Sequence, residues 1–88
     1  MDVVVSPRFM RAYRRLTSDL RGRVDEALRK FVRDPRHPGL HFEKLSGSDY
    51  RTIRPVKGAY RIVLRQIEGG KFELVDVDTH KLVDSKYG

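Results

Sequence analysis

The 88-residue sequence contains no cysteine and no tryptophan, and its apolar runs are short. Without cysteine there is no disulfide framework and no thiolate metal site, which fits a cytoplasmic protein. No run approaches the ~20 apolar residues that a membrane-spanning helix needs, and no signal peptide is recognisable. His37 and His41 have no cysteine or acidic partner at the spacing of metal ligands. We therefore expect no metal, no cofactor and no membrane association.

The chain does carry a large excess of positive charge. Lysine and arginine number 19 against 12 aspartates and glutamates, which gives a net charge of +7. With 39% apolar residues, residues 1–88 form one small domain with a modest core. A small basic domain suits a nucleic-acid or ribosome binder, or a partner for an acidic protein. The alternative is a cationic surface that serves only solubility.

The first half of the chain predicts a strand and two helices. Val3–Val5 is a β-branched run that we expect to be buried on both faces. Ser6 and Pro7 have the residue types of an N-cap and a first helical position. Two apolar stripes with helical spacing follow, and the second ends at Asp34-Pro35. The stripe residues are Phe9, Ala12, Tyr13 and Leu16, then Leu20, Val24, Ala27, Leu28, Phe31 and Val32.

The centre of the sequence predicts a β-hairpin with two arginines side by side. Tyr50–Val56 and Ala59–Ile67 are β-rich runs separated by Lys57-Gly58, a turn signal. In this register Arg54 lies opposite Arg61, and directly opposed like charges destabilise a sheet. Such a pair is expected where an anion lies between the charges. The alternative is that either arginine forms a cross-strand ion pair with an aspartate of the next strand, Asp76 or Asp78.

The order of elements predicts an α+β domain. A further strand at Phe72–Thr79 completes the order β-α-α-β-β-β, with the helical hairpin packed on a small, mostly antiparallel, four-stranded sheet. Pro55 cannot donate to a β-ladder, so Tyr50–Val56 is expected at an edge of the sheet or bulged. The segment after His80 is too short for an assignment.

This order and several short motifs resemble the RelE/ParE superfamily of bacterial type II toxins, in particular its RelE-like branch. The motifs are Lys44-Leu45…Gly47, Tyr50-Arg51-x-Ile53-Arg54, Tyr60-Arg61-Ile62, Val75-x-Val77-x-Thr79-His80, and the stretch 34–45 with Asp34-Pro35 at its start. The likeness spans nearly the whole chain. It implies a toxin with an acidic antitoxin as partner and, in the RelE branch, an endoribonuclease that cuts messenger RNA on the ribosome.

Metal-free RNA cleavage needs cations around the phosphorus and groups that move protons. The 2′-OH attacks, a base takes its proton, an acid protonates the leaving 5′-oxygen, and cations stabilise the phosphorane. Arginine forks match phosphate oxygens, and Glu43 is a further group that could move a proton. With the family resemblance, the predicted catalytic residues are Lys44, Arg54, Arg61 and His80, and the predicted RNA-binding residues are Arg51, Lys57, Arg65 and Tyr87.

The chain departs from the family pattern after its terminal histidine. A tyrosine commonly follows there within a few residues, whereas this chain has Lys81-Leu82-Val83 and then only Tyr87. We therefore expect Val83→Tyr to increase cleavage. Two other functions remain open: a ParE-like toxin that inhibits DNA gyrase without catalysis, and an inactive protein-binding relative. The acidic antitoxin is expected to add a strand at the predicted edge, Tyr50–Val56.

Overall fold

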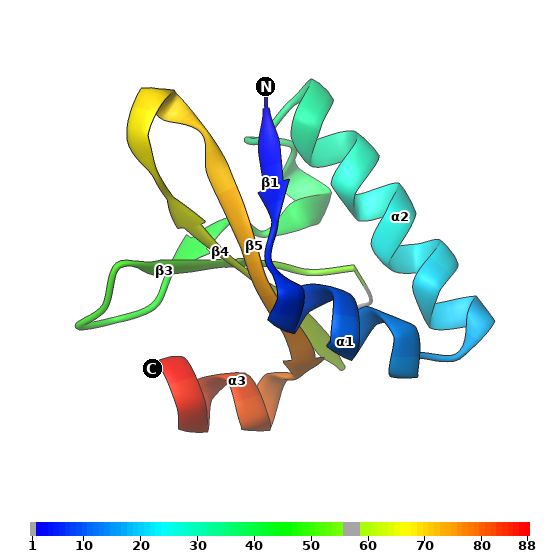
Figure 1. Ribbon diagram of the computed structural model, residues 1–88. Helices are drawn as coiled ribbons and strands as arrows, with labels where there is room; N and C mark the ends of the chain where they lie inside the picture. Colours follow the sequence, from blue (N-terminus) through cyan, green and yellow to red (C-terminus); the bar gives the residue numbers. More distant parts are fainter. Residues whose placement is uncertain (1, 56–58) are drawn as a thin grey trace.

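The structure is a computed structural model that describes residues 2–55 and 59–88. It contains an α+β domain built on a five-stranded sheet in the order β1-β5-β4-β3-β2 (Figure 1). The elements are β1 (Val3–Val5), α1 (Pro7–Arg15), α2 (Ser18–Arg33), the 3-10 turn η1 (Pro38–Leu40), β2 (Glu43–Lys44), β3 (Tyr50–Ile53), β4 (Tyr60–Gln66), the 3-10 turn η2 (Glu68–Gly70), β5 (Phe72–Thr79) and α3 (His80–Tyr87). The fold class is confirmed, and the sheet has one strand more than expected.

Local sequence signals determine where the helices α1 and α2 begin. The Ser6 side chain accepts a hydrogen bond from the Phe9 N–H at 3.0 Å, and Pro7 is the first residue of α1. The Thr17 hydroxyl accepts one from the Leu20 N–H at 3.2 Å and caps α2. These caps satisfy N–H groups that the first turn leaves without partners. The predicted Ser6 cap is therefore confirmed.

The apolar stripes of both helices pack on one face of the sheet. Phe9, Val24, Ala27 and Phe31 are buried, whereas Val32 at the end of the stripe is 38% exposed. Phe31 meets the Phe72 ring edge to face, with centroids 5.3 Å apart. We call this the core face; its strand residues are Ile53, Ile62, Leu64, Phe72, Leu74 and Val77.

The predicted hairpin register is confirmed over the residues that the structure pairs. Tyr50 lies opposite Arg65, and Ile53 lies opposite Ile62. One further step along this register brings Arg54 beside Arg61. The predicted turn, Lys57-Gly58, lies outside the described residues.

Two expectations about the sheet edges are wrong. β1 pairs with β5 in parallel at one edge, and Val4 and Val5 are 43% and 45% exposed rather than buried. β3 is an inner strand, because β2 pairs with it on one side and β4 on the other. The strand ends at Ile53, before Pro55, so the missing N–H of the proline breaks no ladder bond.

The short helix α3 covers the opposite face of the sheet, which we call the second face. Strand alternation places Thr52, Arg61 and Val63 on it. From α3, Tyr87 contacts Asp76 of β5, and Val83 is fully buried. None of the helices within residues 2–55 and 59–88 has the length and apolar character to cross a membrane.

Candidate active site

A buried arginine that forms no ion pair with any described carboxylate lies on the second face. Arg61 is 5% exposed, and its Nη1 donates to the carbonyl of Tyr60 at 3.0 Å. Among the described residues, all ion pairs involve cations other than Arg61 and Arg54. A buried charge is costly unless it is paired. Arg61 is therefore placed to receive an anion that is not part of the chain.

The two aspartates that could have neutralised Arg61 have other partners. Asp78 is its cross-strand neighbour, but the Asp78 carboxylate accepts from Lys86 Nζ at 3.3 Å and from the Thr79 N–H at 2.8 Å. The Asp76 carboxylate accepts from the Tyr87 hydroxyl at 2.7 Å and from the Val77 N–H at 2.9 Å. The alternative of a structural ion pair is thus not observed for Arg61.

Arg54 adds a second positive charge to the same face. Burial, and then the neighbouring Arg54, lower the pKa of Arg61, while Glu43 and Asp84 act on it in the opposite direction. The Nε of Arg54 is buried and has no hydrogen-bond partner among the described residues. The positive charge of Arg54 thus acts on Arg61, and the carboxylates of Glu43 and Asp84 partly offset it.

His80 lies at the same end of the sheet, where β5 passes into α3. Its backbone N–H donates to the carbonyl of Ala59 at 3.0 Å, two residues before Arg61 on the neighbouring strand. Its Nε2 lies 2.9 Å from the Asp84 carboxylate, one helical turn later. Both side chains are about half exposed, at 51% and 53%. A histidine oriented by a carboxylate is a group that can transfer protons.

Of the other predicted site residues, Lys44 and Arg51 lie on the opposite side of the sheet. Lys44 pairs with Arg51, and Arg51 lies opposite Leu64, so alternation places both on the core-face side of the sheet edge. Arg65 forms an ion pair with Glu73 at 2.8 Å. Lys57 lies outside the described residues. The structure therefore brings Arg54, Arg61 and His80 together, and it does not bring Lys44 or Arg51 to them.

Tyr87 anchors α3 to the sheet. Its ring packs edge to face on Tyr50 with centroids 4.9 Å apart, and its hydroxyl also accepts from Arg8 Nη1 at 3.0 Å. Burial, and then the hydrogen bond to Asp76, raise the pKa of Tyr87. Such a ring is held by the protein's own side chains, so it is not free to stack on a base.

Sequence reasoning missed two features of this region. Asp84 was not recognised as the partner of His80, although their spacing of four residues is the helical signal for such a pair. Recognising it required the helix assignment that the terminal segment did not permit. The anchor of Tyr87 joins residues up to 79 positions apart, and no local pattern reports such a contact.

The described residues hold no group of three or more histidine, cysteine, aspartate or glutamate side chains with metal-binding geometry. The arrangement at the second face consists instead of two arginines, a histidine–carboxylate pair and Glu43.

The fold is shared by several solved bacterial and archaeal toxins. No protein-family model matches the chain, and no curated protein does either. A YoeB/ParE toxin from Agrobacterium tumefaciens superposes with a TM-score of 0.72 at 21% identity, covering 91% of this chain and 99% of that one. The RelE toxin in the Methanococcus jannaschii RelB–RelE complex gives 0.71 at 17% identity, covering 97% and 99%.

The intact Escherichia coli RelBE toxin–antitoxin complex gives a TM-score of 0.67 at 23% identity, covering 88% of this chain and 93% of that one. At these identities the likeness concerns the fold. The chain has the fold of the RelE/ParE toxins, as the sequence resemblance implied.

Proposed function

We propose that this chain is the toxin of a type II toxin–antitoxin pair and an endoribonuclease that cuts messenger RNA on the ribosome. The observation that carries the proposal is the buried Arg61, which lies beside Arg54 and forms no ion pair with a described carboxylate. The shared fold supports the toxin role. A target on the ribosome makes the cytoplasm the place of action.

The reaction needs no group beyond the RNA and the side chains of this face. The 2′-oxygen bonds to the neighbouring phosphorus as its proton leaves, and the bond from phosphorus to the 5′-oxygen breaks as that oxygen is protonated. The products are a 2′,3′-cyclic phosphate and a 5′-hydroxyl. Negative charge accumulates on the phosphorane oxygens, and the Arg54 and Arg61 guanidiniums stabilise it with charge-assisted hydrogen bonds.

Two groups on this face are proposed to move the protons. Glu43 lies on β2 opposite Thr52, on the second face, and its charge acts on Arg61. His80 carries Asp84 as its orienting partner. We assign removal of the 2′-OH proton to Glu43, which can only accept a proton as a carboxylate, and protonation of the leaving oxygen to His80, whose ring is oriented by Asp84.

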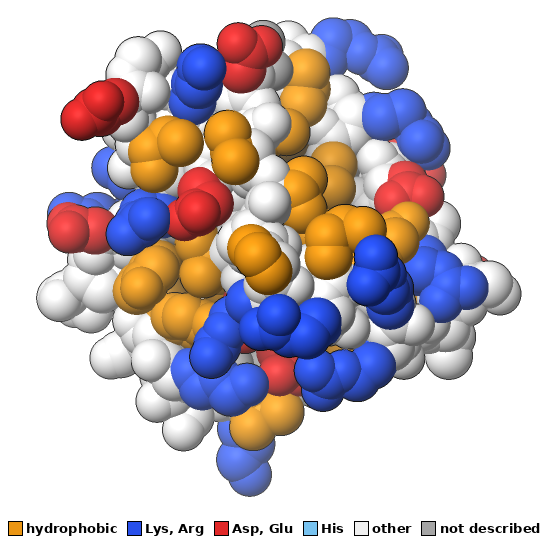
Figure 2. All heavy atoms as spheres, in the orientation of Figure 1, with side chains coloured by type: hydrophobic (Ala, Val, Ile, Leu, Met, Phe, Trp, Pro, Cys, Tyr) orange, Lys and Arg blue, Asp and Glu red, His pale blue; other side chains and the backbone are white. Residues whose placement is uncertain are grey.

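The surface charge supports binding to RNA. Figure 2 shows lysine and arginine side chains gathered over α1 and α3, with an acidic side chain between them. A cleft there is lined by four basic residues, Arg8, Arg11, Arg15 and Lys86, and by Asp76 and Asp78, which form ion pairs with Arg8 and Lys86. Such surfaces bind phosphate backbones without reading sequence. We propose that they hold the toxin on the ribosome.

The proposed antitoxin is an acidic protein. Three of the similar structures are complexes with an antitoxin, from Escherichia coli, Methanococcus jannaschii and Staphylococcus aureus. The expected docking edge at β3 is occupied by β2. The edge strands are β1 and the two-residue β2. We propose that the antitoxin adds a strand at β1, where Val4 and Val5 are exposed.

The proposal is tested by induced expression with parallel labelling of new protein and new DNA. A ribosome-dependent nuclease stops protein synthesis first, and purified toxin cleaves messenger RNA on programmed ribosomes. The control is Arg29→Ala, which removes one exposed charge from α2, away from the second face. A block of DNA synthesis with intact translation would overturn the proposal.

That outcome would favour the second candidate, a gyrase inhibitor without catalysis. The observation on its side is that Tyr87, the only tyrosine after His80, is fixed by Asp76 and Tyr50. A nuclease that needs a free aromatic ring at its active site would lack one here.

A further inference from the structure

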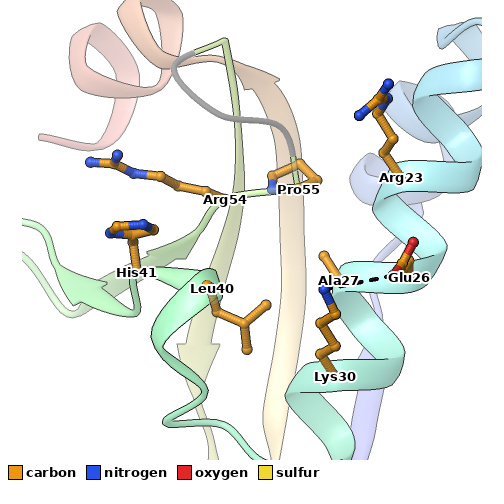
Figure 3. A pocket seen from close by; sticks show the side chains of 9 residues that line it. Arg23, Glu26, Ala27, Lys30, Leu40, His41, Arg54 and Pro55 are labelled. Atoms are coloured by element: carbon orange, nitrogen blue, oxygen red, sulfur yellow. Dashed lines mark ion pairs between the residues drawn. The ribbon is translucent and has the colours of Figure 1, made fainter.

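A pocket of about 410 Å³ lies between α2, η1 and the end of β3 (Figure 3). Its lining includes three apolar side chains, Ala27, Leu40 and Pro55. Ala27 and Leu40 belong to the buried core, at 5% and 1% exposure, so this floor is rigid. The rim is polar. The pocket thus combines an apolar floor with charged walls, an arrangement common in sites for small ligands.

The rim carries more positive than negative charge. Arg23 and Lys30 line it from α2 and Arg54 from the residue after β3, with one carboxylate, Glu26. The Arg54 side chain is directed away from α2 (Figure 3). Lys30 is 3.6 Å from Glu26, and Arg23 is 3.2 Å from Asp19 of the preceding turn, both as exposed pairs. Exposed pairs of this kind contribute little and exchange partners readily. The pocket therefore favours an anionic ligand.

Arg54 joins this pocket to the proposed active site. It lines the pocket, and its charge also acts on Arg61. Its Nε is buried and has no hydrogen-bond partner among the described residues. Arg54 therefore contributes both to the pocket and to the proposed phosphate site.

His41 lines the same pocket with a left-handed backbone. It has φ 49° and ψ 53°, and it is the only non-glycine residue with positive φ in the described part of the chain. This conformation is uncommon outside glycine, and histidine is among the residue types enriched in it. The His41 side chain is exposed, so a ligand can reach its ring. Figure 3 shows His41 on the same side of the pocket as Arg54.

We propose that this pocket binds the base of the nucleotide that flanks the scissile phosphate. The inference rests on the proposed nuclease function and adds a base-binding subsite to it. The floor contacts the face of the base, His41 stacks on it, and Arg23 and Arg54 neutralise the adjoining phosphates. The base preference of the cut is set at this pocket.

The test is a nuclear magnetic resonance titration of the full chain with adenosine and uridine 5′-monophosphate. Backbone signals of Ala27, Leu40 and Arg54 shift, whereas those of Arg29 and Arg33, which are exposed on α2 and do not line the pocket, do not. Ribose 5-phosphate has the same phosphate but no base, so it binds more weakly. Equal affinity for the nucleotides and ribose 5-phosphate would reduce the pocket to a phosphate site and overturn the proposal.

Two variants separate the subsite from general charge attraction. Arg23→Ala and Arg29→Ala remove one exposed charge each from α2, and only Arg23 lines the pocket. Loss of a charge-assisted hydrogen bond predicts about tenfold weaker nucleotide binding for Arg23→Ala alone. Equal binding by the two variants would overturn the proposal.

A third variant tests His41. His41→Asn suits the backbone, so the protein stays as stable or gains stability, while nucleotide binding falls. Unchanged binding would refute the stacking role. The binding assay does not depend on cleavage, so the two proposals can fail separately. If the protein binds nucleotides but does not cleave RNA, the nuclease proposal is refuted and the base-binding pocket stands. If it cleaves RNA but Arg23→Ala and Arg29→Ala bind nucleotides equally well, only the pocket proposal is refuted.

Discussion

Replacement of Arg61 by methionine should increase stability and abolish cleavage in the same protein. Arg61 is 5% exposed and forms one hydrogen bond, to the carbonyl of Tyr60. No described carboxylate pairs with it, and Arg54 repels it. Methionine has a similar length, so it retains the contacts of the aliphatic stem while it removes the charge.

The expected magnitudes follow from burial. Replacing buried charged groups with apolar residues of similar volume is often neutral or stabilising by about 1–4 kcal/mol. The lost hydrogen bond offsets about 1 kcal/mol of any gain. We therefore expect a gain of about 1 kcal/mol, and each 1 kcal/mol raises the melting temperature of such a domain by about 4–8 °C. Loss of one preorganised donor to the phosphorane lowers the cleavage rate by about 10²–10³-fold.

Thermal unfolding and single-turnover cleavage on programmed ribosomes measure the two effects. Arg29→Met, on the exposed outer side of α2, controls for the lost charge and should change neither quantity much. A fall in the melting temperature of Arg61→Met by 10 °C or more, at about 4–8 °C per kcal/mol, would show that the arginine is structural. The argument for an anion site at the second face would then fail.

Two further predictions concern α3. The pKa of Tyr87 is raised in the native state, so the unfolded chain loses this proton first, above pH ~10, and the free energy of unfolding falls as pH rises beyond that value. Urea unfolding at pH 9 to 11 should show a smaller fall for Tyr87→Phe than for the wild type. An identical fall in both proteins would refute the linkage. His80→Ala should slow cleavage about 10²-fold or more, and Asp84→Asn should slow it less, because Asp84 acts through His80. If both variants cleave at the wild-type single-turnover rate, the pair takes no part in catalysis.

The parts of the fold that the sequence predicted are those determined by neighbours along the chain. Ser6 and Thr17 cap helices through groups three residues away. The β3–β4 register is the one that the two neighbouring β-rich runs predict, so the approach of Arg54 to Arg61 could be inferred without a structure.

The parts that it did not predict depend on contacts between distant segments. A run of three valines has the same pattern in a buried strand and in an edge strand, and only the pairing of β1 with β5 decides. The face on which Lys44 lies is set by β2, which is two residues long. The side of the sheet on which Lys44 lies follows from its pairing with Arg51 and from the pairing of Arg51 with Leu64. A two-residue strand has no periodicity from which this could be predicted.

The terminal helix shows how burial reverses an expectation drawn from a family pattern. The pattern predicts that Val83→Tyr restores a missing aromatic ring beside His80 and increases cleavage. Val83 is fully buried against the sheet, so a tyrosine there meets side chains rather than RNA. Overpacking of this kind typically costs about 1–3 kcal/mol. It would also displace the helix that carries His80 and Asp84.

We therefore expect Val83→Tyr to lower both the melting temperature and the cleavage rate. The matched control is Leu82→Tyr, because Leu82 is 46% exposed on the same helix and its replacement leaves the packing intact. Thermal unfolding and cleavage on programmed ribosomes are measured for both variants. A Val83→Tyr protein that is as stable as wild type and cuts faster would mean that α3 leaves the sheet when RNA binds, since only then is position 83 free to contact a base.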